Sequence, residues 1–306
     1  MKRVFFPILT VVFVMMVVTS CKKDEEETVS KITMTTAKTD VVTIIIGGSG
    51  RCTIDWGDGT SELQTLSSFP SQEYSHSYNG KSSRTITITY KNITLFASGK
   101  NQLSGLDVSG CTTLETLHCN DNQLINLDID GCTALTDLGF YHTQLTNFDV
   151  SGCTTLMFLH CVNNFRLTSL NASGCTALID LECNDNQLTS LDVSGCTRLT
   201  GLICSANQLS GLNVTGCTNL KWLICFINQL SSLDMSTCTG LEDLNCDFNQ
   251  LDADTLDNLF RTLHSDVRNG SKTISICDNP GIDGCNPSIA KNKGWDFFCP
   301  EFDNKK

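Results

Sequence analysis

Apolar positions recur with a fixed period of 21 residues over roughly residues 101 to 250. Each period repeats the leucine positions of Leu114, Leu117 and Leu124 and begins with a cysteine, such as Cys111. Successive cysteines of this first set lie 21, 21, 22, 21, 21 and 21 residues apart. The set is Cys111, Cys132, Cys153, Cys175, Cys196, Cys217 and Cys238. Repetition of this kind predicts a solenoid, in which each rung packs only against its neighbours.

A second set of positions lies eight residues after each of these cysteines. It consists of Cys119, Phe140, Cys161, Cys183, Cys204, Cys225 and Cys246. Together the two sets give the pattern Leu-x-x-Leu-x-Cys-x-x-Asn-x-Leu, which resembles the leucine-rich repeat. This resemblance implies one short strand per rung and about seven 21-residue rungs over residues 99–250.

Short runs dominated by β-branched residues, divided by Gly and Ser, fill residues 31–98 and predict a small β-sandwich. Within this region Asp55-Trp56-Gly57-Asp58-Gly59-Thr60, followed later by His76-Ser77-Tyr78, resembles the polycystic-kidney-disease-type (PKD) sandwich domain. We expect Trp56 in the core. Gly57 and Gly59 should allow a tight turn around Asp58.

The 21-residue rhythm stops after Asn249. Leu256, Leu259, Phe260 and Leu263 then recur at helical spacing, with Asp252 or Asp254 available as an N-cap. An apolar run over 273–277, a short helix near Pro287 and a segment around Trp295 follow. We therefore expect a C-terminal α/β cap over residues 251–306, and a fold that is mainly β with some α.

The first twenty residues read as a targeting segment. Lys2 and Arg3 precede an apolar stretch over 4–18 that is short for a membrane-spanning helix. The sequence Val18-Thr19-Ser20-Cys21 resembles the lipobox of bacterial lipoproteins, and the acidic run after it resembles the surface-export signal of Bacteroidota lipoproteins. The resemblance implies a signal peptide over 1–20, lipidation at Cys21, a tether over 21–30 and a location on the outer face of the outer membrane.

Net charge and motif content narrow the function classes. The net charge of −12 argues against nucleic acid as a partner, because phosphate binding needs a basic surface. Neither the G-x-S-x-G nor the H-E-x-x-H motif occurs, so we expect no enzymatic activity, no cofactor and no metal.

The 18 cysteines admit three interpretations: zinc ligands, disulfides or core packing. Zinc is disfavoured by the lack of a C-x2-C pair. Disulfides suit an exported protein, but stacked side chains that point the same way do not give the required dihedral angle. Since Phe140 occupies one position of the second set, we expect buried packing thiols. Cys52, Cys277, Cys285 and Cys299 lie outside the ladder, and a bridge from Cys285 to Cys299 stays open.

Strand alternation identifies the exposed surface. If Leu117 and Cys119 point inward, then Thr116, His118 and Asn120 point to solvent, and every rung has an equivalent triplet. The seven triplets form a surface about 29 Å long at the usual strand spacing. We predict that its ligand-binding residues are Tyr141, Phe158, His160, Glu182, Ile203, Trp222, Ile224, Phe226 and Asn245.

The triplet Trp222, Ile224 and Phe226 is the most informative, because an exposed apolar patch usually marks an interaction site. The alternatives are that the cap or a neighbouring loop covers the patch, or that the strand register differs by one residue. Acidic residues should flank it, namely Asp180, Glu182, Asp243 and Asp247. A further polar row should bond to turn amides; it consists of Asp107, Asp128, Asp149, Asn171, Asp192, Asn213 and Asp234.

The leading functional hypothesis is a surface-anchored, adhesin-like lipoprotein that binds another protein through the exposed strands. This resembles leucine-rich-repeat lipoproteins of Bacteroidota. A glycan ligand is the second hypothesis, with Trp222, Phe226 and Tyr141 stacking on sugar rings. The third is a structural surface protein without a specific ligand.

Overall fold

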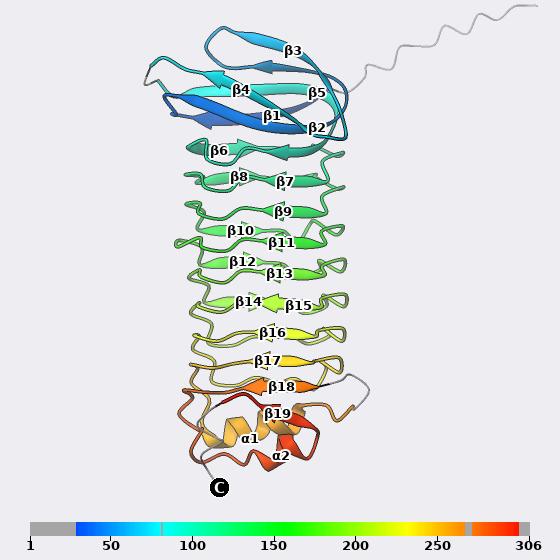
Figure 1. Ribbon diagram of the computed structural model, residues 1–306, viewed down its shortest axis with the longest axis vertical. Helices are drawn as coiled ribbons and strands as arrows, with labels where there is room; N and C mark the ends of the chain where they lie inside the picture. Colours follow the sequence, from blue (N-terminus) through cyan, green and yellow to red (C-terminus); the bar gives the residue numbers. More distant parts are fainter. Residues whose placement is uncertain (1–28, 81, 267–270, 300–306) are drawn as a thin grey trace, which may run out of the picture.

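The computed structural model of the protein describes residues 29–80, 82–266 and 271–299. It is an elongated stack of short strands, covered at one end by longer N-terminal strands and at the other by two helices (Figure 1). The expectation of a mainly β solenoid with few helices is confirmed. Within the described ranges, no helix is long and apolar enough to span a bilayer. The signal segment and Cys21 lie outside those ranges.

One side of the solenoid is a parallel sheet with one three-residue strand per turn. Each strand has a fully buried leucine at its centre, and these leucines pair in register from strand to strand. The strands are β7 (Thr116–His118), β9 (Asp137–Gly139), β11 (Phe158–His160), β13 (Asp180–Glu182), β15 (Gly201–Ile203), β16 (Trp222–Ile224) and β17 (Asp243–Asn245). They correspond to the seven predicted rungs. We call the solvent-facing triplets of these rungs the strand face.

The opposite side carries β6 (Leu103–Asp107), β8 (Asn126–Asp128), β10 (Asn147–Asp149), β12 (Ser169–Asn171) and β14 (Ser190–Asp192). Strand β6 pairs with β8, and β10, β12 and β14 form a separate parallel sheet. The residues of the predicted polar row end these strands and occupy the same position in the two later turns. The side chain of each accepts a hydrogen bond from the backbone N–H two residues further along the chain. The predicted turn-forming role of this row is therefore confirmed.

A ladder of buried asparagines fixes the corner that follows the strand face. The side chain of Asn207 donates to the carbonyl oxygens of Cys183 and Cys204 and accepts from the N–H of Leu188. It thereby bonds the backbone of its own turn and of the preceding one. Equivalent residues are Asn122, Asn164, Asn186, Asn228, Asn249 and Asn279.

The N-terminal region forms β1 (Ser30–Thr36), β2 (Val41–Asp55), β3 (Ser61–Leu66), β4 (Gln72–Ser77) and β5 (Arg84–Ala97). Strand β2 pairs with β3, β4 and β5. The end of β5 pairs in parallel with β7, while β1 pairs antiparallel with β6. Both sides of the solenoid thus continue into these strands, which cover its first turn (Figure 1). A separate domain over 31–98 stays a prediction.

The turn that carries the PKD resemblance folds as expected locally. Trp56 has no exposed surface, and Gly57 and Gly59 both have positive φ. A Cβ at Gly57 would lie 2.3 Å from the carbonyl oxygen of Thr85, so only glycine fits there. The carboxylate of Asp58 accepts hydrogen bonds from the N–H and hydroxyl of Thr60. These contacts confirm a turn-forming role for Asp58.

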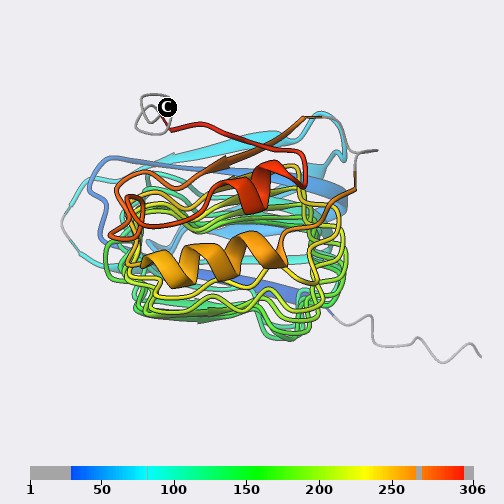
Figure 2. The same ribbon diagram turned by 90° about the horizontal axis from the view of Figure 1, so that it is seen from below.

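The C-terminal region continues the strand face before closing it. Strands β18 (Lys272–Ser275) and β19 (Trp295–Phe297) add two parallel strands beyond β17, an extension that the 21-residue pattern did not reveal. Helices α1 (Ala253–Thr262) and α2 (Ser288–Lys291) lie across the end (Figure 2). The side chain of Asp252 caps α1 by accepting from the N–H of Thr255. Leu256, Leu259 and Phe260 of α1 are buried against the last turns.

Candidate protein-binding face

The side-chain alternation predicted for the strand face is confirmed. Leu117 and Cys119 have no exposed surface, while Thr116, His118 and Asn120 are partly exposed. Phe140 is fully buried at the position that is otherwise cysteine. The register therefore holds in the turn that departs from the pattern. The triplets lie on the solvent side of one parallel sheet, where all their residues are at least partly exposed except Gly139, Gly201 and Ser205.

The apolar triplet of β16 is accessible. Trp222 is 46% exposed while the next residue, Leu223, is completely buried. Ile224 and Phe226 are half-buried, and Ile224 pairs with Ile203 on the neighbouring strand. The indole ring lies 5.9 Å from the ammonium group of Lys221, which forms an ion pair of 3.0 Å with Glu242. The C-terminal cap thus leaves Trp222 open to solvent.

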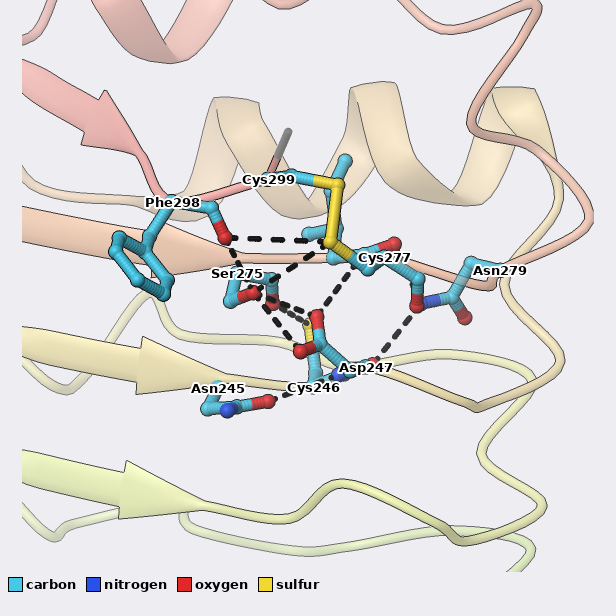
Figure 3. The surroundings of a disulfide bond; sticks show 9 residues. Asn245, Cys246, Asp247, Ser275, Cys277, Asn279, Phe298 and Cys299 are labelled. Carbon is cyan, nitrogen blue, oxygen red and sulfur yellow. Dashed lines mark hydrogen bonds between the residues drawn. A yellow bond between two sulfur atoms is a disulfide. The ribbon is translucent and has the colours of Figure 1, made fainter. Parts of the chain in front are cut away.

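Two of the predicted flanking acids are engaged by the cap. Asp243 accepts a hydrogen bond of 2.7 Å from the hydroxyl of Thr273. The carboxylate of Asp247 accepts from the hydroxyl of Ser275 and from the N–H of Cys277 (Figure 3). Burial raises the pKa of Asp247. Both carboxylates therefore bind β18 and its following turn, which sequence reasoning had not placed beside them.

Asp180 has an unusual environment on the next part of the face. Its carboxylate lies against Gly201, where an added Cβ would be 3.0 Å from Oδ1. That oxygen is buried and accepts no hydrogen bond from any described residue. Burial, and then the neighbouring charge of Glu182, raise the pKa of Asp180. Gly201 thus creates room for the carboxylate to fold flat onto the strand.

Four further predicted residues lie on this part of the face. Phe158 is 38% exposed and pairs with Asp180 across the sheet. The nearest ring nitrogen of His160 lies 4.0 Å from a carboxylate oxygen of Glu182. Asn245 is half-buried and accepts a hydrogen bond from the N–H two residues ahead of it. Asn245 is thus already committed to a local turn.

Tyr141 lies away from the other predicted aromatic residues. It lines a hollow of about 330 Å³ together with Thr43 and Lys100 of the N-terminal region and His118 of β7. Four strand steps separate Tyr141 from the Phe226 position, about 19 Å at the usual spacing. A single sugar ring therefore cannot contact Tyr141 and Trp222 together.

Two exposed apolar residues next to the face were missed by sequence reasoning. Ile227 is 48% exposed and Phe248 is 51% exposed, each directly after a triplet. Both have positive φ, of 52° and 51°. The sequence signal that could have found them is their place in the repeat, because the equivalent residues of the first four rungs are Asp121, His142, Asn163 and Asp185.

The ladder cysteines are buried packing residues with free thiols. Burial raises the pKa of Cys119 and of Cys204 to about 12, so their nucleophilic thiolate is scarce at neutral pH. The thiol of Cys132 donates to the carbonyl oxygen of Val108 at 3.1 Å. The packing interpretation is therefore confirmed, and Cys52 outside the ladder is also buried with a free thiol.

The cap contains one disulfide, between Cys277 and Cys299 (Figure 3). The bridge from Cys285 to Cys299, which the sequence left open, does not form, because Cys299 is bonded to Cys277. Strands β18 and β19 run in parallel with Ile274 opposite Phe297. The two cysteines thus follow the ends of adjacent strands, with Cα atoms 5.7 Å apart, inside the range a disulfide requires.

The exposed histidines form pairs with carboxylates. His118 lies 3.2 Å from Asp137, and His142 lies 2.7 Å from Asp121. Among the described residues, no group of three or more histidine, cysteine or acidic side chains is arranged to hold a metal ion.

No family model and no curated protein matches the chain. Solved structures of Listeria monocytogenes proteins are similar to it. The functional domain of InlJ, described as including a cysteine ladder, is 22% identical with a TM-score of 0.47, covering 68% of this chain and 55% of that one. Internalin C2 is 21% identical with a TM-score of 0.43, covering 55% of this chain and 77% of that one. The chain thus spans about half the length of the InlJ structure.

Proposed function

We propose that this protein binds another protein through the strand face, with the β16 triplet at the centre of the contact. The observation that carries the proposal is a 46% exposed tryptophan on a strand whose neighbouring leucine is completely buried. A rigid sheet presents Trp222 without the entropy cost of ordering a loop, which favours binding.

The chemistry of the triplet fits the centre of a protein interface. Tryptophan is among the residues that dominate measured binding energies, and such residues cluster where apolar neighbours exclude water. Ile203, Ile224 and Phe226 supply those neighbours around Trp222. Phe158, His160 and Glu182 extend the same face by two to three strands, and His160 and Glu182 form its polar margin.

We also propose that the chain is anchored to the outer surface of a bacterial outer membrane, which gives the strand face an adhesin-like role. Support comes from the lipobox-like sequence around Cys21. Replacing Cys21 with Ala should release the protein from the membrane fraction and abolish incorporation of a radiolabelled fatty acid. Unchanged labelling would contradict the anchor.

The binding proposal is tested with a Trp222→Ala, Phe226→Ala double variant on arrays of surface proteins and of glycans. A matched control replaces Asn147 and Ser169, two exposed residues of the opposite side, with Ala. We expect a protein ligand whose affinity falls by at least about tenfold in the double variant, the loss of one interface hot spot. The control should bind like the wild type.

Other outcomes on the arrays separate the alternatives. Loss of binding to glycans alone would favour a sugar ligand, for which the exposed indole ring is the supporting observation. Equal binding by the double variant and the wild type would sink the proposal that the β16 triplet is the contact.

A further inference from the structure

A row of left-handed residues follows the strand face along one edge. Seven of these residues come directly after a triplet, and the eighth follows Cys277 beyond β18; their φ values lie between 51° and 57°. We call this the corner row; it consists of Asp121, His142, Asn163, Asp185, Ala206, Ile227, Phe248 and Asp278. The N–H of Asn207 donates to the carbonyl of Ile227, and that of Asn228 to the carbonyl of Phe248, so successive turns stack along the row.

The amino acids of the corner row change at one place. Asp, Asn and His are enriched in the left-handed region, and they fill the first four turns. Ile227 is β-branched and Phe248 is bulky, and residues of these kinds are rarely found there, because the side chain crowds the backbone. After Phe248, the row returns to Asp278.

Burial does not offset this strain. About half of each side chain, Ile227 and Phe248, is exposed to solvent. Ile227 directly follows Phe226 of the strand face, and its N–H bonds to the carbonyl of Asp247 on the next turn. The apolar surface therefore continues around the edge of the sheet. We call it the apolar corner, made of Trp222, Ile224, Phe226, Ile227 and Phe248.

Acidic residues lie on both sides of the apolar corner, and the ammonium group of Lys221 near the Trp222 ring is ion-paired with Glu242. Glu182 pairs with Ile203 one strand away from Ile224, and Asp243 pairs with Trp222. Asp185 and Asp278 occupy the corner row on either side of Ile227 and Phe248. The seven triplets of the strand face contain five carboxylates and no lysine or arginine. Complementary charge at the margin of an interface selects the partner and steers its approach.

We propose that the apolar corner is the docking site for a partner protein segment in which aliphatic or aromatic side chains are flanked by lysine or arginine. The inference rests on the proposed function. It adds the chemical character of the partner, and it adds Ile227 and Phe248 to the contact surface. Strained, exposed apolar residues destabilise the unbound chain, and a partner that covers them supplies the missing burial. A second copy is disfavoured, because it carries the same net charge of −12.

The first experiment needs no partner. An Ile227→Asn, Phe248→Asn double variant places a residue suited to the left-handed region at both positions. Its melting temperature should rise by about 1 to 3 °C per substitution. The matched control is Ile125→Asn, Phe165→Asn, because these residues are 72% and 63% exposed but lie outside the left-handed region. A rise in the control as large as in the double variant would overturn the strain argument.

The second experiment uses random peptides displayed on phage, selected on the wild-type chain and counter-selected on the Ile227→Asn, Phe248→Asn variant. We expect peptides enriched in Lys or Arg beside apolar residues, with affinity about tenfold lower for the double variant and unchanged for the control. Peptides without basic enrichment, or peptides that bind both forms equally, would overturn the inference.

Three further readouts identify other occupants. A dimer in sedimentation velocity that the double variant dissociates would make a second copy the occupant. A chain that ends at residue 299 could bind the peptides more strongly than the full chain. Residues 300–306 would then be the occupant, because their removal freed the site. Either result overturns the inference.

A protein ligand from the array that binds this double variant normally, yet loses affinity on Phe158→Ala, would also overturn it. The proposed function would survive that result. A ligand unaffected by any of these substitutions would contradict both.

Discussion

At the scale of single residues, the buried asparagine of each turn does most to hold the backbone. The side chain of Asn207 bonds four backbone groups, and two of them belong to the preceding turn. Removing the amide leaves the buried N–H of Leu188 without its acceptor, and such groups are costly. The carbonyls of Cys183 and Cys204 would each keep one bond, from Asn186 and Asn228.

We predict that Asn207→Ala lowers the free energy of unfolding by about 2 kcal/mol, since it leaves the buried N–H of Leu188 unsatisfied and removes hydrogen bonds that join two turns. The exposed neighbour Gln208 provides the control, and Gln208→Ala should change stability by less than about 0.5 kcal/mol. Urea unfolding followed by circular dichroism measures both. An equal, small effect of the two substitutions would show that the asparagine ladder is not structural.

Prediction at the scale of residues succeeded where equivalent positions of successive rungs could be compared with one another. Phe140 revealed that the second cysteine position is apolar packing, and the row that includes Asp107 stood at a turn-forming place in every rung. Ile227 and Phe248 were missed because apolar side chains in a turn give no sign of backbone conformation. Their left-handed φ follows from the closing geometry of the corner, which the first four rungs mark with Asp, His and Asn.

At the scale of elements, the inner cysteine row is a line of buried, protonated thiols along the solenoid axis, interrupted at Phe140. It consists of Cys119, Cys161, Cys183, Cys204, Cys225 and Cys246, all without exposed surface. Burial raises the pKa of Cys119 and of Cys204 from 9.0 to about 12. The row therefore couples the stability of the stack to alkaline pH.

We predict that the protein becomes less stable as pH rises above about 9. In that range the unfolded chain releases thiol protons that the folded chain retains, so the unfolded state binds fewer protons and is favoured. The stabilisation is complete below the unfolded pKa and is lost as pH approaches the folded value. Each buried thiol contributes a slope of about 1.4 kcal/mol per pH unit.

Urea unfolding at a series of pH values measures that slope. Cys204→Ala should reduce it by about 1.4 kcal/mol per pH unit, whatever constant offset the smaller side chain adds. A slope identical to that of the wild type would mean that the thiol at position 204 does not titrate differently in the two states.

Element-scale prediction was weakest in the cap. The sequence showed the apolar run over 273–277. It did not show that β18 continues the strand face in register with β17. That pairing turns Asp243 and Asp247 toward the cap and brings Cys277 beside Cys299. Such contacts depend on which strands become neighbours in space, and a sequence without a repeat in this segment does not determine it.

At the scale of the whole molecule, both ends of the solenoid are covered and the strand face is left open. Strands β1 and β5 bond to the first turn on its two sides, and α1 packs its buried leucines against the last turns. Covered ends remove the unpaired edges and apolar cross-sections that cause association between chains. The exposed apolar residues around Trp222 therefore require another explanation, and the binding of a partner that we propose would supply it.

The distribution of apolar and charged residues gives the strand face two unlike parts. Near β7 and β9 it is polar, with a hollow lined by His118 and Tyr141. Near β15 to β17 it is apolar, with carboxylates at its margin. We expect contact to concentrate at the second part, because apolar burial supplies affinity while marginal charge supplies selectivity.

Hydroxyl-radical footprinting of the chain, alone and with the protein ligand found on the array, tests this central claim most directly. Oxidation of Trp222, Phe226 and Phe248 should fall in the complex, while Phe69, which is 92% exposed in the N-terminal region, should react at the same rate. Unchanged oxidation of Trp222 in a saturated complex, with protection elsewhere, would contradict the account.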